Sequence, residues 1–367
     1  MNEPESSEVH DKGETEYSRM SRIKVGVILT LVLVTVAVAL VTLTVDLGSL
    51  TFSEVIHIIF NKNDPSISRS DRILVWDIYM PRIVCGILAG FALGVAGTVM
   101  QCVLRNPLGS PYTLGISNAA AFGASVGIVL NGGAIIGQSQ ANIVINNPYL
   151  VTASAFIWAM IGTGIIVLLV SITKVDANTM VLAGVAISSI FSAGISALQY
   201  IYNEYALSAI VFWQFGSLGK ATWDELKIIA IVVIPIMLYI IWKRWDFNAL
   251  DNGTDVAKSL GVNVDSLRIM TMVLSALMTA VVVSFMGIIA FIGLLGPHIV
   301  RMVLGNDHRY LIPGSMLIGA IILLIADCVG QSLFTFTLPV GIITSFLGGP
   351  LFLFLLIKGY KRGAMSP

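Results

Sequence analysis

The sequence predicts an all-α polytopic membrane protein that crosses the bilayer about ten times. Of its 367 residues, 56% are hydrophobic and only 11% are charged, and the mean hydropathy is +0.89. Long apolar runs recur along the chain, and clusters of Gly, Pro, Asn or charged residues separate them. A soluble fold of this length could not bury so much apolar surface, so lipid must be one of its solvents.

The first apolar run, Val25–Val45, follows a polar and acidic segment without periodicity. A run of this length gives about 30 Å of helix, which is enough to cross the hydrocarbon core. A signal peptide would place a short basic region directly before a shorter apolar stretch, which this segment does not. We therefore expect residues 1–23 to form a disordered cytoplasmic tail and the run to be the first span.

Eight further apolar runs can each form a helix. The segment Pro297–Leu304 is also apolar, but it is short and Gly and Pro flank it. We expect it to be a half-length broken helix, which is tolerated at membrane depth where protein or water covers its ends. The eight longer runs are Ile83–Leu104, Leu114–Leu130, Leu150–Val170, Thr179–Ile201, Ile228–Trp242, Ile269–Leu295, Leu311–Val329 and Val340–Ile357.

The Lys and Arg residues favour ten spans with both termini in the cytoplasm. In that arrangement most of the 21 Lys and Arg residues lie in cytoplasmic segments, as the positive-inside rule expects. With nine spans, the cluster around Lys361 would lie outside. We predict one transmembrane domain over residues 24–360 in the cell membrane, with a cytoplasmic loop at 247–268 and a cytoplasmic tail at 361–367.

Small residues at helical spacing indicate close packing between spans. Such faces let helix backbones approach each other, which gains contacts where lipid offers no hydrophobic drive. They indicate a compact bundle and carry no information about a solute. The glycines that form these faces are Gly86, Gly90, Gly94 and Gly97 in the second span and Gly123 and Gly127 in the third.

Polar side chains inside the spans are few. The fifth span carries a stripe at intervals of four, four and three residues: Ser188, Ser192, Ser196 and Gln199. These side chains either line a water-filled path or bond back to the preceding turn. Asp327 is the one carboxylate within a long apolar run, and both a functional role and a hydrogen-bonded role near a helix end remain open for it.

The sequence shows no spacing typical of a metal site. Cys85, Cys102 and Cys328 lie within or beside apolar runs, as small buried hydrophobes do. His298 has no second His, Cys or acid at ligand spacing. No phosphate-binding Gly-x-x-x-x-Gly-Lys-Ser/Thr loop follows a strand. We predict no metal and no bound cofactor, and the net charge of zero gives no sign of a nucleic-acid partner.

Three blocks of residues occur in order along the chain. The first contains MPRIVCGILAG, from Met80, and RNPLGSP. The second contains GIIAFIGLLGPHIVR, from Gly287, and DHR. The third contains LPVGIIT, from Leu338, and LGGP. Over about Val75–Lys358 the chain thereby resembles the FecCD family, the permeases of binding-protein-dependent ABC importers for iron–siderophore complexes, haem and cobalamin.

The resemblance implies a cobalamin-permease-like bundle that pairs with a second permease subunit, as a homodimer or a heterodimer. ATP-binding cassette ATPase subunits would hydrolyse ATP with Mg²⁺, a substrate-binding protein would deliver the cargo, and this chain would be no enzyme. An iron–siderophore chelate leads as cargo, with cobalamin or haem as alternatives. An ion-coupled secondary transporter is the rival of another class, but it should carry several buried acids.

The resemblance also assigns residues 247–268 as the loop that docks on the ATPase. Thr254 can cap a short helix that Gly261 ends in a left-handed conformation. Without the family, the loop could equally pack on its own bundle, and Asn252 departs mildly from the family pattern. The residues expected to couple are Asp255, Val256, Ala257, Ser259, Leu260 and Gly261.

The family pattern for docking a binding protein is only partly present. Cobalamin-type relatives carry outward-facing arginines where this chain has Tyr79, Arg82 and Gln331. Only Arg82 carries over, so we expect it to dock the binding protein, with Arg69 and Arg72 of the first outer loop as further candidates. The fifth helix flanks the central pathway in this family, which favours the pathway role for its polar stripe.

Overall fold

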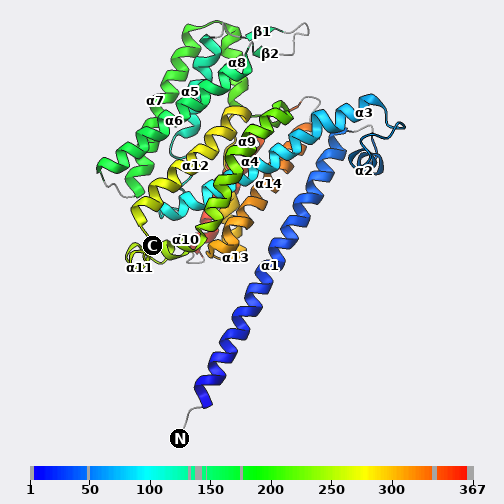
Figure 1. Cartoon of the computed structure of the whole chain (residues 1–367). Helices are drawn as coiled ribbons and strands as arrows, with labels where there is room; N and C mark the ends of the chain where they lie inside the picture. Colours follow the sequence, from blue (N-terminus) through cyan, green and yellow to red (C-terminus); the bar gives the residue numbers. More distant parts are fainter. Residues whose placement is uncertain are drawn as a thin grey trace.

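The computed structural model describes residues 4–47, 50–130, 134–136, 143–145, 147–173, 177–332 and 337–361. Within these residues the chain forms a helical bundle with one small β-hairpin (Figure 1). Seven helices are long and apolar enough to cross a membrane, and the shorter apolar helices Ile116–Leu130, Ile292–Leu304 and Val340–Phe354 bring the total to the ten expected. The predicted all-α polytopic fold is confirmed.

The elements follow one another as a chain of helices. The first half contains α1 (Pro4–Leu47), α2 (Phe52–Phe60), α3 (Arg69–Ile73), the π-helical η1 (Leu74–Tyr79), α4 (Met80–Val103), α5 (Ile116–Leu130), the antiparallel strands β1 (Ala134–Ile136) and β2 (Ile143–Ile145), α6 (Pro148–Thr173), α7 (Ala177–Ile201) and α8 (Glu204–Gln214). The second half contains η2 (Leu218–Lys220), α9 (Trp223–Trp242), α10 (Arg244–Asp251), α11 (Thr254–Ser259), α12 (Val264–Met286), α13 (Ile292–Leu304), α14 (His308–Ser332) and α15 (Val340–Lys361).

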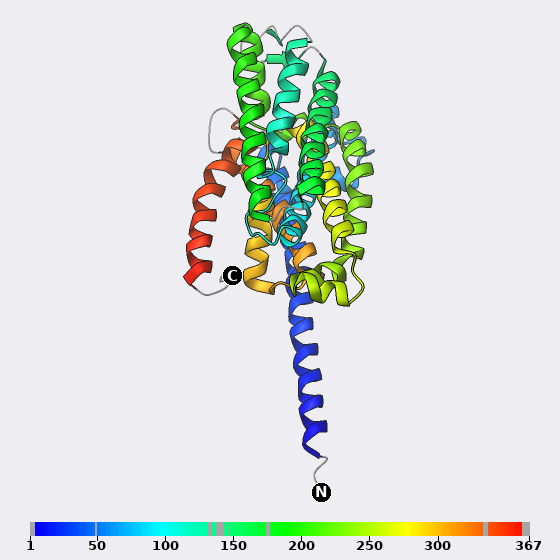
Figure 2. The same ribbon diagram turned by 90° about the vertical axis from the view of Figure 1, so that its left-hand side faces the viewer.

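Helix α1 differs from the disordered tail expected over residues 1–23, because it already begins at Pro4. Its first half projects beyond the bundle (Figures 1 and 2). A helix already nucleated in the apolar run can extend beyond it without a new nucleation step, so the helix can continue into the polar segment. Near its other end, Leu43 and Leu47 are buried against the bundle.

Both described chain ends lie at the same end of the bundle. Helix α15 runs down to Lys361 at the end from which α1 projects, and α10 and α11 lie at that end too (Figure 2). An even number of crossings requires such an arrangement. The two termini therefore agree with ten spans and not with nine.

The break near the end of the chain lies earlier than predicted. The run Ile269–Leu295 is two helices, because α12 ends at Met286 and α13 begins at Ile292. Gly287 and Phe291 turn the chain with φ of +77° and +67°. Pro297 lies inside α13, and the side chain of Gln101 donates to the Gly293 carbonyl (3.3 Å) that Pro297 cannot satisfy.

Helix α4 is the central element, and its glycines allow backbone-to-backbone packing. A Cβ atom on Gly90 would lie 2.4 Å from the Ala320 Cα of α14, and one on Gly97 would lie 1.8 Å from the Gly293 carbonyl oxygen of α13. The predicted glycine face of this span is therefore confirmed. These close backbone contacts fix the positions of α4, α13 and α14 relative to one another, and the candidate sites are attached to these helices.

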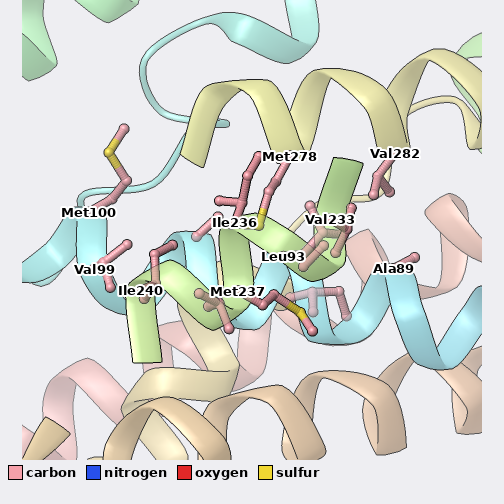
Figure 3. Close-up of a cluster of buried hydrophobic side chains, with 14 of the residues drawn as sticks. Ala89, Leu93, Val99, Met100, Val233, Ile236, Met237, Ile240, Met278 and Val282 are labelled. Carbon is pink, nitrogen blue, oxygen red and sulfur yellow. The ribbon is translucent and has the colours of Figure 1, made fainter. Parts of the chain in front are cut away.

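The other side of α4 packs into an apolar core with α9 and α12. Figure 3 shows these side chains interleaved between the three helices. All of them are buried, so the central part of the bundle is tightly filled. The labelled residues are Ala89, Leu93, Val99 and Met100 of α4, Val233, Ile236, Met237 and Ile240 of α9, and Met278 and Val282 of α12.

Candidate pathway, coupling and docking sites

Helix α10 is fastened to the junction between α13 and α14. Phe247 and Leu250 are fully buried. The Asn248 side chain donates to Asp307 Oδ1 (2.9 Å) and accepts from the backbone N–H of His308 (2.7 Å). Burial alone would raise the pKa of Asp307, but hydrogen bonds from Arg309 and Asn248 outweigh it and lower the pKa to about 2. This junction holds α10 as a rigid base.

Helix α11 presents two apolar side chains to its surroundings. Val256 and Leu260 lie one turn apart and are 45% and 67% exposed. Asp255 and Ser259 are exposed beside them, whereas Ala257 is fully buried and anchors the helix instead of contributing to an outer face. We call α10 and α11 with their closing glycine, residues 244–261, the coupling segment. Its exposed apolar pair on a fixed base is a surface suited to a protein partner.

A glycine with a positive φ lies at each end of α11 and limits the helix to a short segment. Gly253, with φ of +119°, is the residue before the helix, so Thr254 is the first helical residue and not the cap that was predicted. The other end is as predicted, because Gly261 is left-handed with φ of +83°. The N–H groups of Gly261 and Val262 donate back to Lys258 and Ala257 (3.0 Å each), the hydrogen-bond pair of a Schellman motif.

The predicted polar stripe lies along the edge of the exposed face of α7. Ser192 and Ser196 are exposed, and Ser188 and Gln199 are half-buried. The stripe therefore lies between the face of α7 that packs into the bundle and the rest of its exposed face. Ile187, Phe191 and Ile195 pack into the bundle, and Ile190 and Ile201, which are 69% and 71% exposed, lie on the far side.

A groove of about 460 Å³ opens between the end of α8 and the start of α15. The side-chain nitrogen of Gln214 is buried at this groove without a hydrogen-bond partner in the described part of the chain. Phe346 is 78% exposed. Sequence reasoning missed this site, although Ser345 directly follows one of the family blocks. Its lining residues are Gln214, Phe215, Ile288, Gly341, Ile342, Ser345 and Phe346.

Arg82, which was predicted to dock the binding protein, is largely buried and paired within this chain. Its Nε and Nη2 donate to the two carboxylate oxygens of Asp327 at 2.8 and 2.7 Å, and its Nη1 donates to Gln331 Oε1 at 2.9 Å. The Arg82 and Asp327 side chains are only 11% and 4% exposed. The charge joins the start of α4 to the end of α14. Of the two roles left open for Asp327, the structure shows the hydrogen-bonded one.

The other two predicted docking arginines lie just before η1. Arg72 is half-buried, and its Nη2 donates to the backbone carbonyl of Asp64 at 3.1 Å. Arg69 is exposed at the first residue of α3. Of the three arginines, Arg69 is therefore the one whose side chain is displayed.

Three side chains that the sequence keeps apart meet beside α10. A donor atom from each of Cys102, Asp251 and His308 lies within 4.8 Å of the other two. The Nε2 of His308 lies 3.0 Å from Asp251 Oδ2. The residues belong to α4, α10 and α14, so their spacing along the chain could not indicate this cluster.

Comparison with known proteins gives consistent results. The sequence model of the FecCD transport family matches residues 29–358. A protein of Methanocaldococcus jannaschii named as an ABC transporter permease is 48% identical over 316 residues, which are 85% of this chain and 88% of that protein. The hemin transport system permease protein of Yersinia pestis is 36% identical over 286 residues, 77% of this chain and 83% of that protein. A solved structure described as an inward-facing conformation of a metal-chelate type ABC transporter is similar with a TM-score of 0.76 and 28% identity, covering 91% of this chain and 99% of that one.

Proposed function

The chain belongs to the FecCD transport family, and we propose that it is the transmembrane permease subunit of a binding-protein-dependent ABC importer that moves an iron–siderophore-type chelate into the cytoplasm. The observation that carries this proposal is the coupling segment. It combines a fixed base, α10, with an exposed apolar pair on α11. A transport helix bundle has no need of such an outward pair unless another protein covers it.

In this function, ATP hydrolysis on two partner ATPase subunits moves α11. Because Asn248 ties α10 to the junction of α13 and α14, a displacement of α11 reaches the transmembrane helices without being absorbed by a loop. The permease alternates between outward-facing and inward-facing states as a result. In this proposal, the coupling segment and both termini lie on the cytoplasmic side of the cell membrane.

A second permease subunit completes the pathway in this proposal. The groove at Gln214 and Phe346 and the stripe on α7 would contribute amide, hydroxyl and aromatic groups to this pathway. A large chelate passes such a wall through weak contacts and does not bind tightly to it. The substrate-binding protein docks at the opposite end, with Arg69 as the displayed charge.

The coupling role is tested by substitution at Leu260. The assay uses proteoliposomes that contain the permease, its ATPase and its binding protein. Leu260→Asp should abolish ATP-dependent uptake and co-purification with the ATPase, because burying an unpaired carboxylate in the apolar contact with the ATPase is unfavourable. Ser171→Asp, at an exposed position near the end of α6 and outside the predicted docking loop, adds the same charge and should leave both intact. Wild-type uptake by Leu260→Asp would show that α11 does not couple.

The choice of cargo is tested in the same vesicles. Uptake of a ferric siderophore above that of haem and cobalamin is the expected result. The name of the Yersinia relative favours haem as the second candidate, whereas the name of the structural neighbour favours a metal chelate. Preference for haem or cobalamin would correct the cargo and leave the importer assignment standing.

An ion-coupled transporter is the rival that the structure disfavours. Asp327 is the acidic side chain buried among the described residues, and Arg82 already neutralises it. A proton or sodium relay would need acids that can change charge during the cycle. Uptake driven by an ion gradient without any ATPase would favour the rival.

A further inference from the structure

The cluster of Cys102, Asp251 and His308 serves neither the groove nor the exposed face of α11. Cys102 lies near the end of α4, Asp251 is the last residue of α10, and His308 is the first residue of α14. Their donor atoms lie within 4.8 Å of one another. We propose that these three side chains bind a divalent transition-metal ion of the Zn²⁺ class at the base of the coupling segment.

The donor set matches this class of ion. A thiolate, an imidazole and a carboxylate are the three ligand types that Zn²⁺ takes in proteins, whereas Mg²⁺ and Ca²⁺ prefer oxygen alone. Bonds of about 2.0–2.3 Å place tetrahedral ligands roughly 3.3–3.8 Å apart. The 3.0 Å between His308 Nε2 and Asp251 Oδ2 is a hydrogen bond, so these two atoms need to separate by only a few tenths of an ångström.

The surroundings hold two ligands firmly and leave the third adaptable. The Cys102 side chain is buried against the Phe247 carbonyl, with a sulfur-to-oxygen distance of 3.6 Å. The His308 ring packs against Phe247, and its backbone N–H is held by Asn248. The Asp251 side chain is 33% exposed, so it can move and leaves the fourth position open to water.

Two neighbouring arginines, Arg301 and Arg105, contribute positive charge near the site. Arg301 donates to Gln101 Oε1 (3.0 Å) and lies close enough for its charge to act on Asp251 and Cys102. In the metal-free protein this guanidinium compensates the Asp251 carboxylate. A bound dication, thiolate, carboxylate and Arg301 together leave a net charge of only +1, because the two anionic ligands offset the ion.

Binding is a simple exchange of protons for a metal. The S–H bond of Cys102 breaks, its proton leaves to solvent past Asp251, and a sulfur–metal bond forms. The ring proton of His308, which lies on Nε2 while that nitrogen donates to the Asp251 carboxylate, moves to Nδ1, and Nε2 and the carboxylate then each form a bond to the ion. No oxidant or reductant is needed. The ion then joins α4, α10 and α14, so its presence stiffens the base of the coupling segment whether or not an ATPase is bound.

The site is tested on the purified full-length chain in lipid nanodiscs, with Co²⁺ alone as the probe. We expect one Co²⁺ per chain, a near-ultraviolet thiolate-to-cobalt absorption band, and displacement by Zn²⁺. Cys85→Ser, which removes another buried thiol of α4, should keep the band, and Cys102→Ser should lose it. His308→Gln and Asp251→Asn should weaken binding about tenfold or more. A band that persists in Cys102→Ser, or none in the folded wild type, overturns the proposal.

Amide hydrogen exchange gives a second readout. At a Zn²⁺ concentration that just saturates the wild type, the ion should slow exchange over residues 244–261 in the wild type and in Cys85→Ser, should slow it clearly less in Asp251→Asn, and should leave it unchanged in Cys102→Ser. Asp251 is partly exposed, so its variant keeps the fold even if Cys102→Ser does not. Equal slowing in Asp251→Asn and the wild type would place the ion elsewhere and contradict the proposal. None of these measurements depends on the proposed transport function.

Discussion

Arg82 shows that a charged residue with a buried partner can hold two helices together, although its sequence context predicts a binding role. Its guanidinium binds both oxygens of Asp327 at a place where both side chains are almost fully covered. A charge in that setting stabilises the contact between two helices, provided that its partner stays in place. The same arginine, read from its sequence block alone, resembles a docking residue.

Removing one member of this pair should lower the free energy of unfolding substantially. Asp327→Asn leaves the Arg82 charge buried without a counter-ion, and we expect a loss of about 3–5 kcal/mol in the free energy of unfolding. The double variant Arg82→Met/Asp327→Leu should recover most of it. Asp224→Asn, which breaks the exposed pair with Lys227, should cost less than about 1 kcal/mol. Denaturant unfolding in one detergent measures all three. Equal stability of Asp327→Asn and Asp224→Asn would contradict this account.

Asp307 gives a prediction about pH. Its pKa in the folded protein is lowered to about 2, whereas an unfolded Asp titrates near 4. A lowered pKa contributes stability that is complete above about pH 4 and is lost as the pH falls through about 2. The stability difference between the wild type and Asp307→Asn should therefore shrink over this window. Unfolding at constant ionic strength checks it, and a difference that stays constant between about pH 6 and pH 2 would refute it.

Among the elements, the end of α12 shows where sequence reasoning falls short. A proline inside an apolar run predicts a helix break, and Pro297 was assigned that role. The carbonyl it leaves unbonded is satisfied by Gln101 from α4, so the helix continues. The break lies instead at Gly287 and Phe291, and a left-handed phenylalanine has no sequence signature. The spans themselves were predictable, because composition and length decide them within each segment.

Two glycines, one at a helix contact and one without a close neighbour, should respond oppositely to substitution by alanine. Gly97→Ala would place a Cβ atom 1.8 Å from the Gly293 carbonyl oxygen, so α4 and α13 must separate. We expect a loss of about 1–3 kcal/mol or more, as in other overpacked cores. Gly164→Ala in α6 meets nothing within 4 Å and should gain about 0.5–1 kcal/mol from helix propensity. Thermal unfolding of both variants tests this, and equal shifts would contradict it.

At the scale of the whole molecule, the sites divide by how far their residues lie apart. The coupling segment is local, so its exposed apolar pair and its closing glycine could be predicted from a short stretch of sequence. The pair of Arg82 and Asp327 spans 245 positions, and the cluster at Cys102 joins three helices. Such contacts depend on which helices pack side by side. Neither residue type nor spacing contains that information, so these contacts required the structure.

The proposed pathway makes a prediction for the whole molecule in its membrane. In a Cys328→Ser background, where Cys85 and Cys102 are buried, single cysteines at Ser192 and Ser196 should react with a charged, membrane-impermeant thiol reagent. Cysteines at Ile190 and Ile201, on the far side of α7, are also exposed in the isolated chain but would face lipid. Lipid excludes the reagent and disfavours the reactive thiolate, so these two should not react. Because all four positions are exposed in the isolated chain, exposure alone would not separate them, whereas a water-filled path along the serine stripe would. Equal labelling at all four positions would place the pathway elsewhere.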